Sequence, residues 1–167
     1  IGQLTDAGNT TTLAHYLELL QGAGMLAGLT KYCHGQARQR GSSPKLQVLN
    51  TALMSAQDPR SLSEVRNDGD QWGRMVESAV GAHLFNSSFG TGISVNYWRE
   101  RSQEVDFVLQ QGKSVVAIEV KSGGRRQSLP GMAAFAQQFK PKRQLLVGGQ
   151  GIAVEEFLSK PAAHWFQ

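Results

Sequence analysis

The spacing of apolar residues along the chain predicts an alternation of helices and strands. Apolar side chains recur at the three- and four-residue spacing of amphipathic helices over residues 13–20, 72–84 and 129–139. The hydroxyls of Thr10, Thr11 and Thr12 can cap the first of these helices, and a short closing helix is expected over 154–158. Shorter apolar runs predict strands over residues 25–32, 45–49, 93–98, 105–109, 114–120 and 144–147.

The order of these elements predicts an α/β protein built from two units. Residues 1–56 contain a helix, a strand, a loop and a strand, which is the second half of a winged helix. The loop carries Arg38 and Arg40, so this unit either binds DNA through a wing or serves only for protein contacts or as a spacer. Residues 57–70 are polar and are predicted to be a linker. We expect residues 71–167 to form a separate mixed sheet of four strands flanked by helices.

Two neighbouring predicted strands carry acidic residues within an otherwise apolar stretch. If these strands pair as a hairpin with Leu109 opposite Ser114, then Asp106 falls opposite Ala117. Side chains alternate between the two faces of a strand, so Glu119 shares a face with Ala117. This places Asp106 within diagonal reach of Glu119.

Lys121 shares the face of Glu119, so an aspartate, a glutamate and a lysine are expected to converge at one edge of the sheet. Two buried carboxylates are unfavourable together unless a cation compensates them. Their oxygens suit Mg²⁺, or Mn²⁺ in its place, and a nearby lysine can hold a nucleophilic water or a phosphate. The alternative interpretation is a solvated, charged strand edge. Arg125 and Arg126 follow in a basic loop that would either hold a phosphate backbone or form a solvated turn.

The composition favours an anionic partner. The net charge is +4 and the isoelectric point is about 9.5, which points first to nucleic acid, here DNA. No apolar run approaches the ~20 residues that span a bilayer, and the one cysteine, Cys33, fits a reducing compartment. We therefore expect a cytoplasmic protein without a membrane partner. The glycine-rich segment 148–151 lacks the lysine and hydroxyl residue of a phosphate-binding loop and is predicted to be a turn.

The succession of Asp106 and then Glu119-Val120-Lys121 resembles the PD-(D/E)xK nuclease superfamily, which includes restriction endonucleases and Holliday-junction resolvases. The resemblance implies a restriction-endonuclease-like mixed sheet in which Asp106, Glu119 and Lys121 are catalytic. It also implies that Glu77, on the preceding helix, is a further metal-facing acid beside Asp106 and Glu119.

The chain as a whole resembles the C-terminal part of a group of prokaryotic AAA-type ATPases. In those proteins an ATPase precedes a winged helix and a restriction-endonuclease-like domain of uncharacterised function. Because the first residue is Ile1, we expect a fragment, with the ATPase portion as a partner. Because the ATPase motifs are missing from this sequence, we expect no ATP site in it. The resemblance leaves open a metal-dependent nuclease acting on DNA phosphodiesters and a non-catalytic DNA- or protein-binding module. A regulatory winged-helix protein, the third possibility, rests on the N-terminal unit alone.

Overall fold

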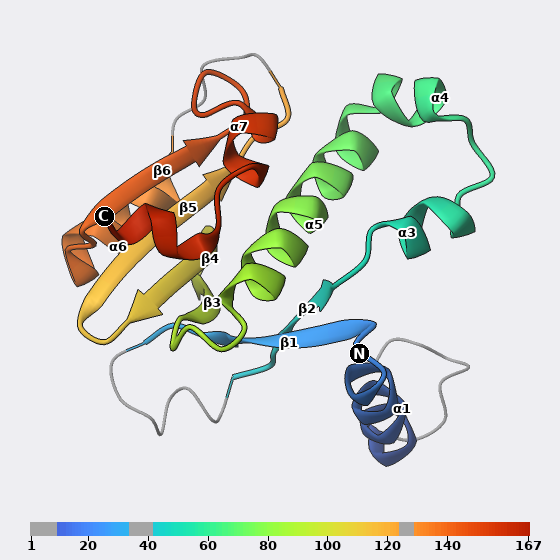
Figure 1. Ribbon diagram of the computed structural model, residues 1–167, viewed down its shortest axis with the longest axis horizontal. Coiled ribbons are helices and arrows are strands. Elements are labelled where there is room, and N and C mark those ends of the chain that lie inside the picture. The colour runs from blue at the N-terminus through green and yellow to red at the C-terminus, as the bar shows by residue number, and fades with distance from the viewer. Residues whose placement is uncertain (1–9, 34–41, 124–128) are drawn as a thin grey trace.

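A computed structural model describes residues 10–33, 42–123 and 129–167 (Figure 1). In chain order its helices and strands are α1 (Thr10–Gly22), β1 (Leu26–Lys31), β2 (Lys45–Val48), α3 (Ala52–Gln57), α4 (Leu62–Asn67), α5 (Gly69–Ser88), β3 (Ser94–Glu100), β4 (Gln103–Gln111), β5 (Ser114–Val120), α6 (Pro130–Phe139), β6 (Arg143–Val147), α7 (Val154–Leu158) and the 3-10 helix η1 (Ala162–Phe166). The helices and strands that the apolar spacing predicted are present in the expected order, and α3, α4 and η1 are additional elements that it did not predict.

The strands form one mixed sheet with the order β2-β1-β3-β4-β5-β6. The pairs β1–β3 and β5–β6 are parallel, and the other neighbours are antiparallel. The expectation of a four-stranded sheet in a separate unit is therefore wrong. The two N-terminal strands join the sheet because β1 buries Ala27 and Leu29 and pairs through Thr30 with Asn96 of β3. α1, β1 and β2 follow in the predicted order, but β2 and β1 form the edge of the common sheet, so a winged-helix unit is not confirmed.

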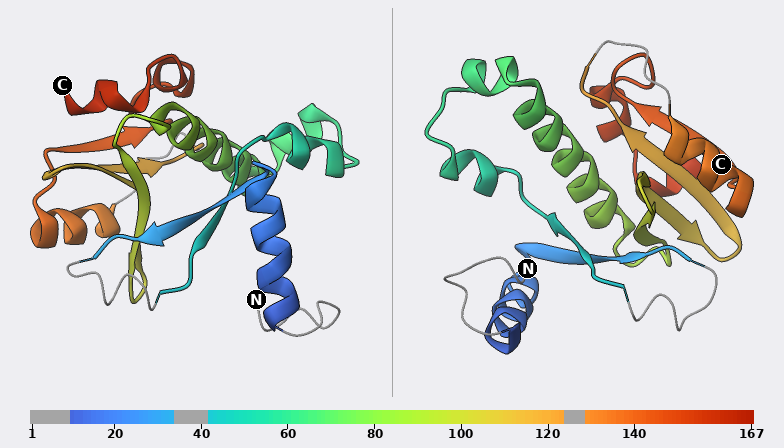
Figure 2. Two further views of the ribbon diagram at one scale, coloured as in Figure 1. Left: turned by 60° about the horizontal axis from the view of Figure 1, so that its bottom comes forward. Right: turned by 180° about the vertical axis from the view of Figure 1, so that it is seen from behind.

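Helices cover both faces of the sheet (Figure 2). On one face, α5, α7 and η1 enclose a core that includes Val80, Phe107, Ile118 and Phe157. On the opposite face, α6 packs Met132 and Phe135 against a smaller apolar cluster of β3, β4 and β5. The strands β4 and β5 lie between these two cores. Their central residues are consequently buried on both faces, as expected for a sheet covered on both sides.

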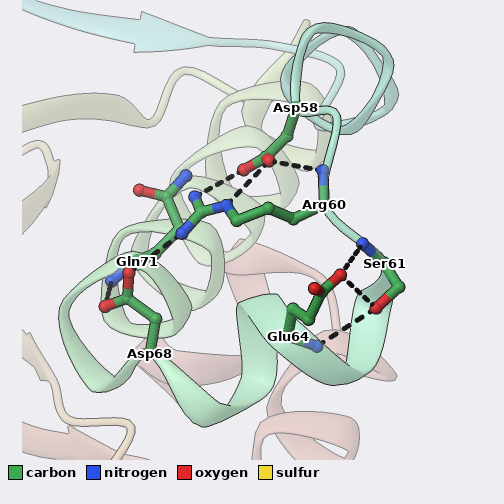
Figure 3. A network of polar contacts seen from close by, with 6 residues as sticks. All are labelled: Asp58, Arg60, Ser61, Glu64, Asp68 and Gln71. Atoms are coloured by element: carbon green, nitrogen blue, oxygen red, sulfur yellow. Dashed lines mark hydrogen bonds and ion pairs between the residues drawn. The ribbon is translucent and has the colours of Figure 1, made fainter.

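The expected linker contains a short helix, α4, that is tied to the start of α5. Ser61 and Glu64 form a capping box at the beginning of α4 (Figure 3). The Arg60 guanidinium donates to Asp58 at 2.9 and 2.7 Å and to Asp68 at 3.0 Å. Asp68 is also the N-cap of α5, where its side chain accepts a hydrogen bond from the backbone N–H of Gln71. This network fixes α4 against the first turn of α5.

The strand β2 packs against α5 through a buried glutamine and a glycine. The Gln47 amide donates to the backbone carbonyls of Val48 at 2.7 Å and Ser78 at 2.9 Å. A Cβ atom added at Gly81 would lie 2.0 Å from the Gln47 Oε1 atom and 2.7 Å from the Phe107 ring. Only glycine fits at this position of the helix. The contact holds β2 against α5 and so brings Lys45, the first residue of β2, to Glu77 of α5.

We expect Gly81→Ala to lower the free energy of unfolding by about 1–3 kcal/mol, because the added methyl overpacks a core that is already full. Urea unfolding at neutral pH measures this change. Gly69→Ala in the same helix is the matched control, since nothing lies within 4 Å of a Cβ atom at Gly69. A Gly81→Ala variant as stable as the Gly69→Ala control would contradict this packing.

Candidate functional site

The hairpin of β4 and β5 has a different register from the one expected. Gln111, rather than Leu109, pairs with Ser114, and Phe107 pairs with Ile118. The connection is a two-residue turn in which Gly112 has a positive φ of 58°. Because side chains alternate with a period of two, this two-residue difference preserves the face of every side chain. The expected juxtaposition of Asp106 with Ala117 is wrong, and the observed register carries Asp106 towards Glu119 instead.

An irregularity between β3 and β4 sets the direction of Asp106. Asn96 pairs with Val108 and Trp98 with Val105, so β4 has one residue more than β3 between these pairs. Such a β-bulge re-aims a side chain at the point where it occurs. Here the Asp106 Oδ2 atom accepts a hydrogen bond of 2.8 Å from the backbone N–H of Val120. The carboxylate therefore lies against the end of β5 that carries Glu119.

Both carboxylates are buried, and their charges are unequally compensated. Asp106 is 6% exposed and Glu119 is 7% exposed. The Lys121 Nζ atom lies 2.8 Å from one oxygen of Glu119, while the other oxygen, Oε2, is buried without a hydrogen-bond partner. Burial raises the pKa of Asp106 to about 7, and the charges of Glu119 and Glu77 add to this rise. Burial lowers the pKa of Lys121, but its hydrogen bond to Glu119 and the charge of that residue outweigh this effect, so the pKa is raised.

Glu77 lies at the border of this group and has its own partner. The Lys45 Nζ atom is 2.6 Å from a Glu77 carboxylate oxygen and 5.1 Å from the centre of the Phe107 ring. The negative charge of Glu77 contributes to the raised pKa of Asp106. Within the described ranges, no three acidic, histidine or cysteine side chains are grouped closely enough to hold a metal ion. The described residues thus give no support to an ion shared by all three of Glu77, Asp106 and Glu119, and this shared ion stays a prediction.

Lys45 is a residue of the site that the sequence did not indicate as one. It was the first residue of a predicted strand, 32 positions before Glu77, and had no role in the predicted site. Its position depends on the pairing of β1 with β3 and on the packing of Gln47 against Gly81. Neither contact has a local sequence signal.

The turn after β6 holds the backbone of Lys121 in place. The Lys121 N–H donates to the Val147 carbonyl at 2.9 Å. Gly148 has a φ of 75°, and a Cβ atom there would lie 2.3 Å from the Lys121 carbonyl oxygen. Gly151 donates back to Gly148 at 2.9 Å, which confirms the predicted turn. These glycines allow β6 and its turn to approach the end of β5 closely.

A cleft of about 460 Å³ lies between the first half of α5 and the segment that follows β5. Glu77 and Lys121 line it, together with Arg66, Trp72 and Arg74. In Figure 1 the start of α5 and the end of β5 lie on the same side of the molecule. The cleft gives a ligand access to the edge at which Lys121 pairs with Glu119.

The basic residues expected to contact nucleic acid cannot be placed in this site. Arg38, Arg40, Arg125 and Arg126 all lie outside the described residues. Their roles stay predictions.

Comparison with known proteins identifies the family of this chain. The sequence profile of a family described as "Domain of unknown function (DUF4143)" matches residues 72–157, just over half of the chain. The chain belongs to the DUF4143 family. Searches of curated proteins and of solved structures gave no significant match. The DUF4143 domain often occurs together with AAA-type ATPases.

The DUF4143 match spans most of the candidate site. It includes Glu77, Asp106, Glu119 and Lys121, and it begins after Lys45 and Arg66. The sheet nevertheless contains two strands that precede the match, so the DUF4143 region packs with residues outside it. In the part of the chain that the structure describes, no helix has the length and apolar character needed to cross a membrane.

The raised pKa of Asp106 makes a prediction about stability and pH. Between about pH 4 and pH 7 the folded protein keeps a proton on Asp106 that the unfolded chain releases. The free energy of unfolding should therefore fall as pH rises through this window. Asp106→Asn removes the titration, and its side-chain carbonyl can still accept from Val120. We expect this variant to gain stability relative to the wild type as pH rises, by about 1.4 kcal/mol for each pKa unit.

Urea unfolding of both proteins at several pH values measures this effect. Asp58→Asn is a control of opposite sign, because hydrogen bonds from Arg60 lower the pKa of Asp58 to about 2. That carboxylate contributes stability above the unfolded pKa, and its contribution is lost as pH falls towards 2. A stability difference between Asp106→Asn and wild type that does not change with pH would show that Asp106 titrates normally.

Proposed function

We propose that this domain is a metal-dependent nuclease that hydrolyses DNA phosphodiesters. The observation that supports this most strongly is the buried carboxylate of Glu119, which has one oxygen paired with Lys121 and the other without a partner. A buried carboxylate oxygen without a hydrogen bond is unfavourable, and a cation is its natural complement. Asp106 lies close enough for the charge of Glu119 to raise its pKa.

The carboxylates suit a magnesium or manganese ion. Mg²⁺ is commonly held by one or two carboxylates and completes its coordination with water and substrate phosphate oxygens. Asp106 and Glu119 would supply the two carboxylates. Glu77 would become a further ligand only if its ion pair with Lys45 opened. When bound, the ion would lower the pKa of a coordinated water and neutralise charge on the phosphodiester. It would also bring the pKa of Asp106 down.

The remaining residues of the site have separate tasks in this proposal. Lys121 would donate from its ammonium group to a phosphate oxygen or to the attacking water, since its side chain lines the open cleft. The hydrogen bond from Val120 would keep the Asp106 carboxylate directed at the end of β5. Lys45 would hold Glu77 and limit the negative charge beside Asp106. The ATPase portion of a longer protein is the proposed partner, and it would deliver or move the DNA.

One observation favours a second function, a non-catalytic module that binds DNA or the ATPase. Two lysines already neutralise two of the three carboxylates, Lys45 with Glu77 and Lys121 with Glu119. A site compensated by lysines in this way can be stable without a metal ion. The two functions differ in their need for metal, which is therefore the property to test.

Cleavage of duplex, branched and single-stranded DNA with Mg²⁺ or Mn²⁺ tests the nuclease proposal. We expect cleavage to need the metal, and we expect Glu119→Gln and Lys121→Ala to lower its rate on the order of a hundredfold or more. Lys113→Ala is the matched control, because Lys113 lies exposed in the β4–β5 turn at the other end of the hairpin. Thermal unfolding verifies that each variant folds.

Two results would reject the nuclease. One is the lack of nicking of any of these DNAs with either metal, accompanied by no metal binding in calorimetry. The other is cleavage that survives unchanged in both Glu119→Gln and Lys121→Ala. The first result together with retained DNA binding would establish the binding module instead.

A further inference from the structure

The wall of the cleft opposite Lys121 comes from α4 and the start of α5. It contains Arg66, Trp72 and Arg74, whereas Lys121 and Glu77 belong to the candidate catalytic group. Arg66 and Arg74 are both exposed, and neither forms an ion pair with another described residue. Arg60 and Arg99, by contrast, are engaged with aspartate or glutamate. Two arginines without an ion-pair partner among the described residues thus line the same cleft as Lys121 and Glu77.

Arg66 is positioned by its surroundings. Its guanidinium lies 5.1 Å from the centre of the Trp72 ring, a cation–π contact between the end of α4 and the first turn of α5. The Arg60 network and the capping box of α4 hold these two helices together (Figure 3). A guanidinium fixed in this way loses little conformational entropy when it binds an anion.

A glycine of α5, Gly73, lines the cleft between Trp72 and Arg74. Gly73 lies within α5, where glycine costs about 1 kcal/mol relative to alanine. A Cβ atom at Gly73 would be 3.2 Å from the Ser122 hydroxyl oxygen, so the segment after β5 passes close to the helix here. Gly73 therefore adds no side chain to the cleft between its neighbours Trp72 and Arg74.

We propose that Arg66 and Arg74 bind backbone phosphates of a DNA strand lying in this cleft, and so place a neighbouring phosphate at Lys121. This rests on the proposed function, for which it supplies the residues that hold the substrate. Guanidinium groups match phosphate oxygens in charge and in geometry. The acidic residue of the same wall, Asp70, is exposed and opposes phosphate binding. The wall therefore contains residues whose removal should change affinity in opposite directions.

Fluorescence anisotropy of a labelled DNA oligonucleotide in EDTA, which prevents cleavage, tests the proposal over a series of salt concentrations. We expect the double variant Arg66→Ala/Arg74→Ala to lose affinity on the order of tenfold and to reduce the slope of log K against log salt by about two. Asp70→Asn should bind more tightly than wild type. The control is Lys113→Ala/Arg143→Ala, which removes the same charge at the far end of the sheet, where Arg143 pairs with Val116.

Equal losses in the two double variants would overturn the proposal, because the effect would then follow net charge rather than the cleft. A wild-type protein that does not bind DNA, or an Asp70→Asn variant that binds no more tightly, would also overturn it. A different result would reject the nuclease proposal and retain the cleft. The arginine variants would lose affinity as expected, while the wild type would cleave no DNA with Mg²⁺ or Mn²⁺. Cleavage that occurs with unchanged affinity in the arginine variants would retain the nuclease and reject the cleft.

Discussion

Two carboxylates are buried side by side where the hairpin of β4 and β5 ends, and the charges around them are arranged accordingly. Asp106 and Glu119 are both buried. Burial raises the pKa of Asp106, and one buried oxygen of Glu119 has no hydrogen-bond partner. Lys121 compensates Glu119, and Lys45 compensates the nearby Glu77. Burying carboxylates together in this way costs stability. Residues whose pKa values are perturbed by burial and by neighbouring charges are common at functional sites.

The part of the site that lies on one hairpin could be predicted from the sequence. The run from Ser114 to Val120 is apolar and bounded by turn residues, and its limits are those observed. Strand alternation places Glu119 and Lys121 on one face whatever the register, and their contact is confirmed. The predicted pairing of β4 with β5 was wrong by two residues, because the turn at Gly112 and Lys113 is shorter than expected. The bulge beside Asp106 left no sequence signal.

The part of the fold that depends on distant contacts could not be predicted. The N-terminal strands join the main sheet through β1 and β3, which are separated by more than 60 residues. Gln47 fits against Gly81 of α5 only in the folded protein, and this contact brings Lys45 to Glu77. Residues 57–70 looked like a linker because their composition is polar. That polarity instead supplies caps and the ion pairs of Arg60, which fix one wall of the cleft.

We propose that Asp106 and Glu119 together hold a divalent metal ion. Anomalous diffraction from a crystal containing Mn²⁺ tests it most directly, because the signal identifies the ion and its ligands at once. We expect a manganese peak within coordination distance of carboxylate oxygens of both residues, with Lys121 displaced from or sharing the Glu119 carboxylate. Ordered Asp106 and Glu119 side chains without a peak between them, at a Mn²⁺ concentration well above that used for cleavage, would contradict the claim.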